Sequence, residues 1–207
     1  MARKTAAEAA RTRKKILDAA GDLFSREGVA NTTLEQVAQQ ASVTRGAIYW
    51  HFKGKEDLLR TLFGEQTLPL ENSLPEGIDF SSGWQRLHGD LVETVCGEMP
   101  RRLSEIMMYQ GACGADPATH QRRLARVRES CMHRLQTLLE NAVSKEELPS
   151  ALDIQGALDF FRFCITGLLY ECLQDSSDPV DAITSALAVL LHVVKVPPQH
   201  FLLKKSV

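Results

Sequence analysis

Apolar residues recur at intervals of three and four along most of the chain, which is the spacing of one face of an α-helix. The first such stretch runs from residue 6 to residue 27, and its apolar positions are Ile16, Leu17, Ala20, Leu23 and Phe24. Gly28 follows, at the position where a left-handed residue often ends a helix. The pattern therefore predicts a helix over residues 6–27.

Two shorter helices are predicted directly after it. Thr33 can cap a helix, and Gln36 stands three residues later, where it completes a capping box. The stripe of this helix is formed by Leu34, Val37, Ala38 and Ala41. After a break at residues 41–43, Thr44 can cap a third helix that reaches about Trp50. Three helices in this arrangement are typical of a helix-turn-helix.

The rest of the chain also reads as helical. A fourth helix is expected over residues 55–66, and residues 68–83 form a link rich in helix breakers: Pro69, Pro75, Gly77 and Gly83. Further helices are expected at 82–98, 100–113, 117–143, 151–174 and 179–195, and the tail from Val196 is expected to fray. We predict an all-α fold, with a three-helix helix-turn-helix domain at 1–54 joined to a helical bundle at 55–207, in which 55–66 is a connecting helix.

The charges of the two parts differ in sign. Residues 1–60 carry 11 Lys and Arg against 7 Asp and Glu, whereas the remainder carries 13 against 19. A basic front suggests that only this part meets a polyanion, although a solvated surface has the same composition. No apolar run approaches the roughly 20 residues that cross a bilayer, and the first residues do not form a secretory signal. A cytoplasmic protein is expected.

The chemistry of residues 44–46 suits the major groove of DNA. A helix-turn-helix lays its second helix there, with the first side chains of that helix on base edges. Thr44 and Arg45 occupy this turn, and Arg45 can donate two hydrogen bonds to a guanine, worth ~1–3 kcal/mol of discrimination. Gly46 has no side chain, so the backbone can approach the duplex closely.

Polar groups around this helix can bind the DNA backbone. Tyr49, His51 and Lys55 can reach phosphates, and Thr33 can place its hydroxyl and a helix N-terminus at another. The leading arm adds sequence-independent attraction through Arg3, Lys4, Arg11, Arg13, Lys14 and Lys15. The alternative is that the aromatic residues at 49–52 are core residues, which we expect for Phe52 and in part for Trp50.

Residues 11–63, and above all the run TRGAIYWHFK from Thr44, resemble the DNA-binding domain of the TetR family of bacterial transcriptional repressors. The run is particularly similar to the AcrR- and TtgR-like branch, which represses multidrug efflux pumps. A looser similarity continues in RRLSEIM from Arg101, ELP at Glu147 and RFCITGL from Arg162. The resemblance implies a homodimer, an effector-binding C-terminal domain and DNA-facing residues at Thr44, Arg45, Gly46, Tyr49, His51 and Lys55.

One departure from that branch limits what can be carried over. A Lys-Cys-Glu triplet is common there after the segment that corresponds to residues 105–107, whereas Met108 and Tyr109 follow here. The link at 68–83 is also short. The identity of an inducer is therefore not transferred from the branch.

Two roles are open to the helices that follow residue 55. Bundle cores hold ligand cavities, which are mostly apolar with a few polar groups, and the candidates for such a site are Phe63, Met107, Met108, Phe163, Thr166 and Tyr170. The same residues can simply be core. The last two helices carry wide apolar faces that one chain would struggle to cover, which favours two-fold pairing: Leu158, Phe161, Ile165, Leu168, Leu169, Ile183, Leu187, Leu190, Leu191 and Val194.

Catalytic and metal-binding patterns are missing from the sequence. There is no GxSxG, GxxxxGK, GxGxxG or HExxH motif, so we expect neither an enzyme nor a cofactor. Cys131 and His133 lie two residues apart on a predicted helix and make a poor metal pair. The cysteines form no CxxC pair and are expected to be reduced and mostly buried, with a redox-sensing thiol as the alternative: Cys96, Cys113, Cys131, Cys164 and Cys172.

A second group of basic residues lies outside the first domain. We expect these arginines on solvated helix faces rather than at a second nucleic-acid site: Arg101, Arg102, Arg122, Arg123, Arg126 and Arg128.

The sequence thus predicts a ligand-responsive bacterial repressor. As a homodimer it would bind a pseudo-palindromic operator, control a multidrug efflux operon and leave DNA when small apolar or cationic compounds make helix 55–66 pivot. The alternative is a DNA-binding regulator whose C-terminal domain binds a protein partner and no small molecule. A ligand-dependent change in DNA affinity separates the two.

Overall fold

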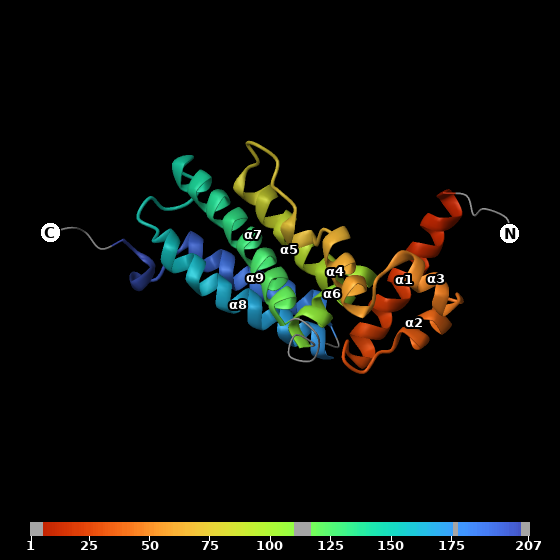
Figure 1. Ribbon diagram of the computed structural model, residues 1–207. Coiled ribbons are helices and arrows are strands. Elements are labelled where there is room, and N and C mark those ends of the chain that lie inside the picture. The colour runs from red at the N-terminus through yellow and green to blue at the C-terminus, as the bar shows by residue number, and fades with distance from the viewer. Residues whose placement is uncertain (1–5, 110–116, 176–177, 204–207) are drawn as a thin grey trace. The chain divides into compact units, whose positions relative to one another are not determined.

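The computed structural model describes residues 6–109, 117–175 and 178–203 (Figure 1). Within these ranges the chain forms nine α-helices, two short 3₁₀ helices and no strand, only an isolated bridge between Leu152 and Leu202, so the predicted all-α fold is confirmed. The α-helices are α1 (Ala6–Glu27), α2 (Leu34–Gln40), α3 (Arg45–His51), α4 (Lys55–Glu65), α5 (Phe80–Cys96), α6 (Glu98–Tyr109), α7 (Pro117–Ser144), α8 (Ile154–Asp175) and α9 (Pro179–Lys195). The 3₁₀ helices are η1 (Pro69–Glu71) and η2 (Gln199–Phe201).

The chain folds into two compact units. The first comprises residues 1–67 and 102–124, and the second comprises residues 68–101 and 125–207. Helices α1 to α4 belong to the first unit, and α5, α8 and α9 to the second. The helix α6 begins in the second unit and continues in the first.

In the first unit, α1 packs against α2, α3 and α4. Its core is the apolar stripe predicted from the sequence, joined by residues of the three shorter helices: Ile16, Ala20, Leu23, Phe24, Val37, Ile48, Leu58 and Leu62. Gly28 ends α1 with a φ of 85°, and Thr33 caps α2 with the predicted capping box to Gln36. Periodicity and caps therefore predicted these four helices almost to the residue.

The turn between α2 and α3 is held by backbone bonds. The N–H of Val43 donates to the carbonyl of Ala38 across 2.9 Å, and that of Ser42 donates to Gln39 across 3.1 Å. Ser42 adopts a φ of 55°, a left-handed conformation that glycine adopts at lower cost than serine. This turn fixes the direction in which α3 leaves α2.

In the second unit, α5 packs against α8, α9 and η1. Three aromatic rings build part of its core: Trp84 lies 5.6 Å from Phe80 and 5.9 Å from Phe161 between ring centroids. The expected link at 68–83 is wrong at both ends. At the first end, Leu68 and Leu70 are buried around η1. At the second end, α5 already starts at Phe80, capped by Asp79, so Gly83 lies inside the helix, where it packs against Leu138.

A buried ion pair crosses the second unit, and the sequence pattern did not predict it. Arg134 of α7 donates to the Asp90 carboxylate of α5 across 2.5 Å and to the carbonyl of Pro69 across 3.2 Å. Both side chains keep only 9 % of their surface exposed. A buried pair of this kind is costly to break at one partner, so it fixes α5, α7 and η1 together.

The segment after α9 is ordered through residue 203, and the prediction that it frays from Val196 is wrong there. Asp153 donates its N–H to the carbonyl of Phe201, and Leu203 donates to Ala151, each across 2.8 Å. The ring of Phe201 also lies 5.6 Å from that of Phe160. Residues 204–207, and the predicted end of a helix at 110–113, lie outside the described residues.

The apolar faces of α8 and α9 are mostly covered within the chain, which corrects the expectation for them. Leu158, Phe161, Ile165, Ile183, Leu187, Leu190 and Val194 are all buried. A different apolar set is exposed: Phe160, Phe163 and Tyr170 on α8, and Val180 and Val189 on α9. Two arginines expected on solvated faces are bonded within the chain: Arg123 is buried and donates to the carbonyl of Gln66 across 2.7 Å, and the partly buried Arg101 donates to the carbonyls of Val95 and Leu173.

The cysteines behave as structural thiols where they are described. Cys131 and Cys172 are buried, Cys164 is partly buried and Cys96 is exposed, whereas Cys113 lies outside the described residues. Burial raises the pKa of the Cys131 thiol to about 11, which keeps it protonated and unreactive.

Candidate nucleic-acid interface

The short helix α3 has one buried side and one exposed side. Its N-cap is Thr44, whose hydroxyl accepts the N–H of Ala47 across 3.2 Å. Ile48 is fully buried and Phe52, which follows the helix, is 2 % exposed, so these two residues hold α3 against the unit. The opposite side is exposed and carries Arg45, Gly46, Tyr49 and Trp50. A surface helix presented in this way can enter a major groove.

Arg45 is held by neighbours on two helices. Its guanidinium pairs with Glu35 of α2, donates to the hydroxyl of Tyr49 across 3.2 Å and lies 5.5 Å from the centroid of the Tyr49 ring. The hydrogen bond to Tyr49 and the charge of Glu35 raise the pKa of Arg45 above its usual value. Two of the residues predicted to face DNA, Arg45 and Tyr49, are therefore brought together, and Glu35 joins them.

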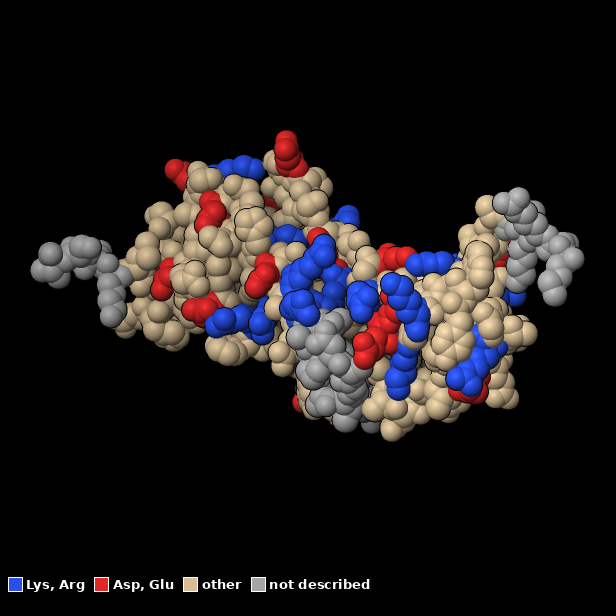
Figure 2. All heavy atoms as spheres, viewed as in Figure 1, with Lys and Arg blue, Asp and Glu red and all other residues tan. Residues whose placement is uncertain are grey.

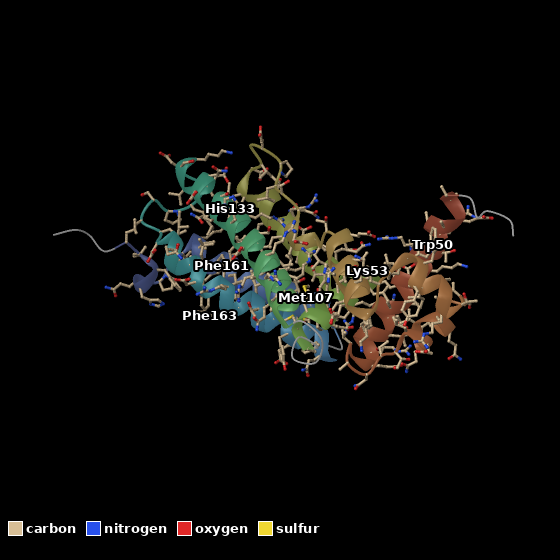
Figure 3. The ribbon with its side chains drawn as sticks, in the orientation of Figure 1. Trp50, Lys53, Met107, His133, Phe161 and Phe163 are labelled. Atoms are coloured by element: carbon tan, nitrogen blue, oxygen red, sulfur yellow. The ribbon has the colours of Figure 1, made fainter. Side chains whose placement is uncertain are left out.

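Trp50 is 73 % exposed, so the expectation that it is partly core is wrong. Its ring meets His51 edge-on at 4.4 Å between centroids. Lys53, which is labelled with Trp50 in Figure 3, follows on the exposed surface. Phe52, by contrast, is buried as predicted. The helical spacing of Ile48 and Phe52 would have shown Trp50 as a surface residue. Ile48 and Phe52 lie four residues apart and share the buried side, whereas Trp50 lies two residues from each and faces away from them.

Thr33 and Lys55, both predicted to bind phosphate, are already bonded within the unit. The hydroxyl of Thr33 donates to the side chain of Gln36 across 2.9 Å and accepts from its N–H. The ammonium of Lys55 donates to the carbonyls of Ala30 and Thr32, each across 3.0 Å. Lys55 thus fastens the loop between α1 and α2, a role that the sequence did not suggest. Phosphate binding by these two residues stays a prediction.

Acidic partners neutralise much of the positive charge of the first unit. On the face drawn in Figure 2, Lys and Arg side chains lie next to Asp and Glu side chains. The pairs include Arg13–Glu65, Lys14–Asp18, Arg26–Asp22 and Arg45–Glu35. Attraction to DNA therefore depends on cations outside such pairs; Lys53, for example, is exposed and makes no side-chain bond to the described residues.

Arg13, predicted as part of a basic arm, has a structural role. It donates from both terminal nitrogens to the carboxylate of Glu65 on α4, and its guanidinium lies 5.3 Å from the centroid of Phe52. The hydrogen bond from Arg13 lowers the pKa of Glu65. The contact ties α1 to α4 and supports the end of α3. Arg3 and Lys4 of the same arm lie outside the described residues.

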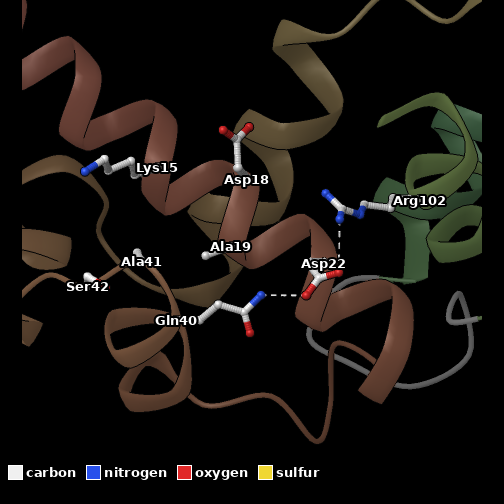
Figure 4. Close-up of a pocket in the computed structure, with 8 residues that line it drawn as sticks. All are labelled: Lys15, Asp18, Ala19, Asp22, Gln40, Ala41, Ser42 and Arg102. Atoms are coloured by element: carbon white, nitrogen blue, oxygen red, sulfur yellow. Dashed lines mark hydrogen bonds and ion pairs between the residues drawn. The ribbon is translucent and has the colours of Figure 1, made fainter. Parts of the chain in front are cut away.

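A surface cleft of about 430 Å³ lies in the first unit (Figure 4). Its walls come from α1, the end of α2 and α6: Lys15, Asp18, Ala19, Asp22, Gln40, Ala41, Ser42 and Arg102. The carboxylate of Asp22 accepts from Gln40 across 2.5 Å and pairs with Arg102 at 3.1 Å. The cleft is therefore crossed by polar contacts of the unit itself.

The residues predicted to bind a ligand fall into two groups. Phe63 and Met107 are buried in the first unit, and Met108 is half-buried there. Phe163, Thr166 and Tyr170 lie on the exposed side of α8, where Phe163 keeps 69 % of its surface. This exposed placement suits contact with another molecule better than the lining of a closed pocket, and the ligand assignment stays a prediction.

The described part of the chain has neither a metal-binding cluster nor a membrane-spanning helix. No group of three or more His, Cys, Asp and Glu residues within it could hold a metal ion. No helix within it is long and apolar enough to cross a membrane.

The fold and the exposed α3 define the class of protein: an all-α protein with an N-terminal helix-turn-helix for DNA. Comparisons with known proteins agree. Residues 16–62 match the family described as bacterial regulatory proteins, tetR family. The transcriptional regulator SrpR of Pseudomonas putida is 34 % identical over 206 residues, which cover 100 % of this chain and 96 % of SrpR. The chain belongs to the TetR family.

Two other relatives define the similarity further. The regulator AcrR of Shigella flexneri is 34 % identical over 207 residues and 96 % of each chain. The structure of the SmeT–triclosan complex matches with a TM-score of 0.74 and 27 % identity over 90 % of this chain and 93 % of SmeT, the repressor of the Stenotrophomonas maltophilia efflux pump SmeDEF. The predicted resemblance to the efflux-regulator branch is confirmed, and the chain stands among transcriptional regulators rather than enzymes.

Proposed function

We propose that the chain is a cytoplasmic, ligand-responsive repressor that binds a pseudo-palindromic operator as a homodimer. The observation that carries this proposal is the exposed side of α3, with Arg45, Gly46, Tyr49 and Trp50 facing outward while Ile48 holds the helix from behind. Each protomer would place this side in one major groove.

The side chains of α3 and its neighbours would divide the work on DNA. Arg45 would donate two hydrogen bonds to guanine O6 and N7, and Gly46 would let the backbone approach the bases. Tyr49, His51 and Lys53 would contact phosphates and set the register, and the exposed ring of Trp50 would add apolar contact. Thr44 would begin the helix at the groove while its hydroxyl accepts the N–H of Ala47.

The exposed apolar side of α8 and α9 supports a homodimer. Phe163 and Tyr170 on α8 and Val189 on α9 present large apolar side chains to solvent, although most of the remaining apolar residues of these helices are buried. A two-fold axis would cover the same patch on both copies. It would also set two recognition helices about 34–36 Å apart, the distance between successive major grooves.

The relatives support a role in multidrug efflux. SmeT represses an efflux pump and has been solved with triclosan bound, and SrpR and AcrR are transcriptional regulators. We infer that this chain represses an efflux operon and that small apolar or cationic compounds release it. The acidic balance of residues 61–207, with 13 Lys and Arg against 19 Asp and Glu, is compatible with cationic inducers.

Release would follow from opposed binding of ligand and DNA. An inducer would favour a state in which α4 pivots and the two recognition helices no longer match the groove spacing. The coupling is reciprocal and is typically ~1–3 kcal/mol, so a saturating inducer would weaken operator binding by about 5- to 150-fold.

The test is a titration of the purified protein against a fluorescent duplex that the protein itself selects from a random library. We expect a preference for the selected duplex over a scrambled one, and a loss of affinity in the presence of triclosan or a cationic dye. Operator binding that no such compound changes would favour the alternative, a C-terminal domain that binds a protein partner.

A further inference from the structure

We propose that Glu35 is a specificity-determining residue of the DNA-binding surface: by pairing with Arg45, it suppresses contacts of Arg45 with phosphates and leaves its contact with guanine intact. The inference rests on the proposed role of Arg45 in reading a base. Glu35 belongs to α2, and its side chain reaches Arg45 on the recognition helix α3.

The guanidinium of Arg45 is restrained from two directions. Its NH1 group pairs with the carboxylate of Glu35, and its NH2 group donates to the hydroxyl of Tyr49 across 3.2 Å. The Tyr49 ring lies under it at 5.5 Å from the centroid. Both charged side chains keep 58 % of their surface exposed, so this arrangement is open to DNA. The guanidinium therefore already lies against both partners before DNA is bound.

The restraint leaves the donors that a guanine needs. An arginine side chain has five N–H groups, and Glu35 and Tyr49 take one each. The other three meet no acceptor among the residues that the structure describes. A guanine in the major groove takes two hydrogen bonds, on O6 and N7. Arg45 can thus keep both of its protein partners while it binds the base.

A phosphate is a poorer partner for the same arrangement. Its negative charge is repelled by the carboxylate of Glu35, and the Arg45 charge is already neutralised, so Arg45 displaces fewer counterions from the duplex. The guanine acceptors are neutral atoms and are affected much less. Glu35 therefore lowers affinity for DNA in general more than it lowers affinity for a duplex with guanine at the right position. Specificity gained through such repulsion is a difference between two affinities.

The test compares Glu35→Gln with Glu56→Gln in the full-length protein. Glu56 is an exposed carboxylate in the first turn of α4, so its substitution removes the same charge from the same unit without touching Arg45. Affinity is measured at several salt concentrations for the duplex selected by the wild type and for a scrambled duplex of equal length. For Glu35→Gln we expect about tenfold tighter binding to scrambled DNA, a salt slope steeper by about one, and little change on the selected duplex.

Two further variants show whether the change in specificity depends on the pair of Glu35 and Arg45. In an Arg45→Ala background, Glu35→Gln should no longer change the ratio of the two affinities, because the residue that it restrains is gone. Glu35→Ala removes the same carboxylate in another way and should behave as Glu35→Gln does, with thermal unfolding as the check on folding.

The outcomes separate this inference from the proposed function. The decisive quantity is the ratio of the affinity for the selected duplex to the affinity for the scrambled duplex. The inference is overturned if this ratio is unchanged in both Glu35 variants. It is also overturned if Glu56→Gln changes the ratio equally, or if Glu35→Gln changes it equally in the Arg45→Ala background. If the wild type itself prefers no duplex, the proposed function fails. If the wild type has a preference that Arg45→Ala loses and Glu35→Gln keeps, only the role of Glu35 is rejected.

Discussion

Arg102 of α6 pairs with Asp22 of α1 across 3.1 Å, and the same carboxylate accepts from Gln40 at the end of α2 across 2.5 Å (Figure 4). One turn further along both helices, Ser25 of α1 donates to Glu105 of α6. The neighbouring arginine of α6, Arg101, is bonded in the second unit, to the carbonyls of Val95 and Leu173. Asp22 therefore joins α1, the end of α2 and α6 within the first unit.

The pair of Asp22 and Arg102 should contribute measurably to stability. Its side chains keep only 20 % and 23 % of their surface, so solvent screens the pair less than a fully exposed one. In a double-mutant cycle of Asp22→Ala and Arg102→Ala, we expect a coupling of about 0.5–1 kcal/mol in the free energy of unfolding. The control cycle is Lys14 with Asp18, which is far more exposed and should give about 0.3–0.5 kcal/mol. Equal coupling in both cycles contradicts the role assigned to Asp22.

Substitution of Lys55 should affect stability, whereas substitution of Lys53 should affect DNA binding. Lys55→Met removes two bonds to the carbonyls of Ala30 and Thr32, so we expect the free energy of unfolding to fall by about 1–2 kcal/mol. Lys53→Met should leave stability unchanged and make the salt dependence of DNA binding shallower by about one. Chemical denaturation and anisotropy at several salt concentrations measure both. A Lys55 variant of native stability would show that its ammonium does not fasten the loop.

The helices and the helix-turn-helix were predictable from the sequence because their signals are local. A stripe at a spacing of three and four, Gly28 and the Thr33 capping box all act within a few residues. The failures involve partners distant in sequence. Gly83 looked like a linker residue because the pattern does not contain Leu138, and the tail looked free because its bonds go to Ala151 and Asp153.

The same distinction holds for the candidate site. The position of Arg45 on the recognition helix followed from Thr44 and the turn before it. Its pairing with Glu35 did not, since the sequence gives no angle between α2 and α3. The exposed apolar residues of α8 and α9 were also predicted wrongly. The sequence shows that both helices are rich in apolar residues, but not which of these residues the rest of the chain covers.

Gly83 should tolerate no side chain. A Cβ there would collide with a methyl group of Leu138, which is buried and has little room to move. We expect Gly83→Ala to lower the free energy of unfolding by about 1–3 kcal/mol. Gly89 lies in the same helix facing open space, so Gly89→Ala should raise stability by roughly 0.5–1 kcal/mol. Thermal unfolding of both variants decides the point, and a neutral Gly83→Ala would refute close packing at this position.

Ser42 should be replaceable by glycine with a gain in stability. Its φ of 55° is a left-handed conformation that disfavours a residue with a Cβ. Ser42→Gly relieves this cost but makes the unfolded chain more flexible, so we expect a net gain of about 0.5–1 kcal/mol. Denaturant unfolding gives the value. A loss of stability would indicate that the side chain of Ser42 makes a contact that outweighs the strain.

The most direct test of the account is protection of guanine N7 from methylation by dimethyl sulfate, since N7 lies in the major groove, where Arg45 is expected to donate. The wild-type protein bound to its selected duplex should protect guanines in two half-sites about one helical turn apart. Arg45→Ala, at a concentration that saturates the duplex, should expose one guanine in each half-site and leave the others protected. Identical protection by the two proteins, or no protected guanine at all, would contradict base reading by α3.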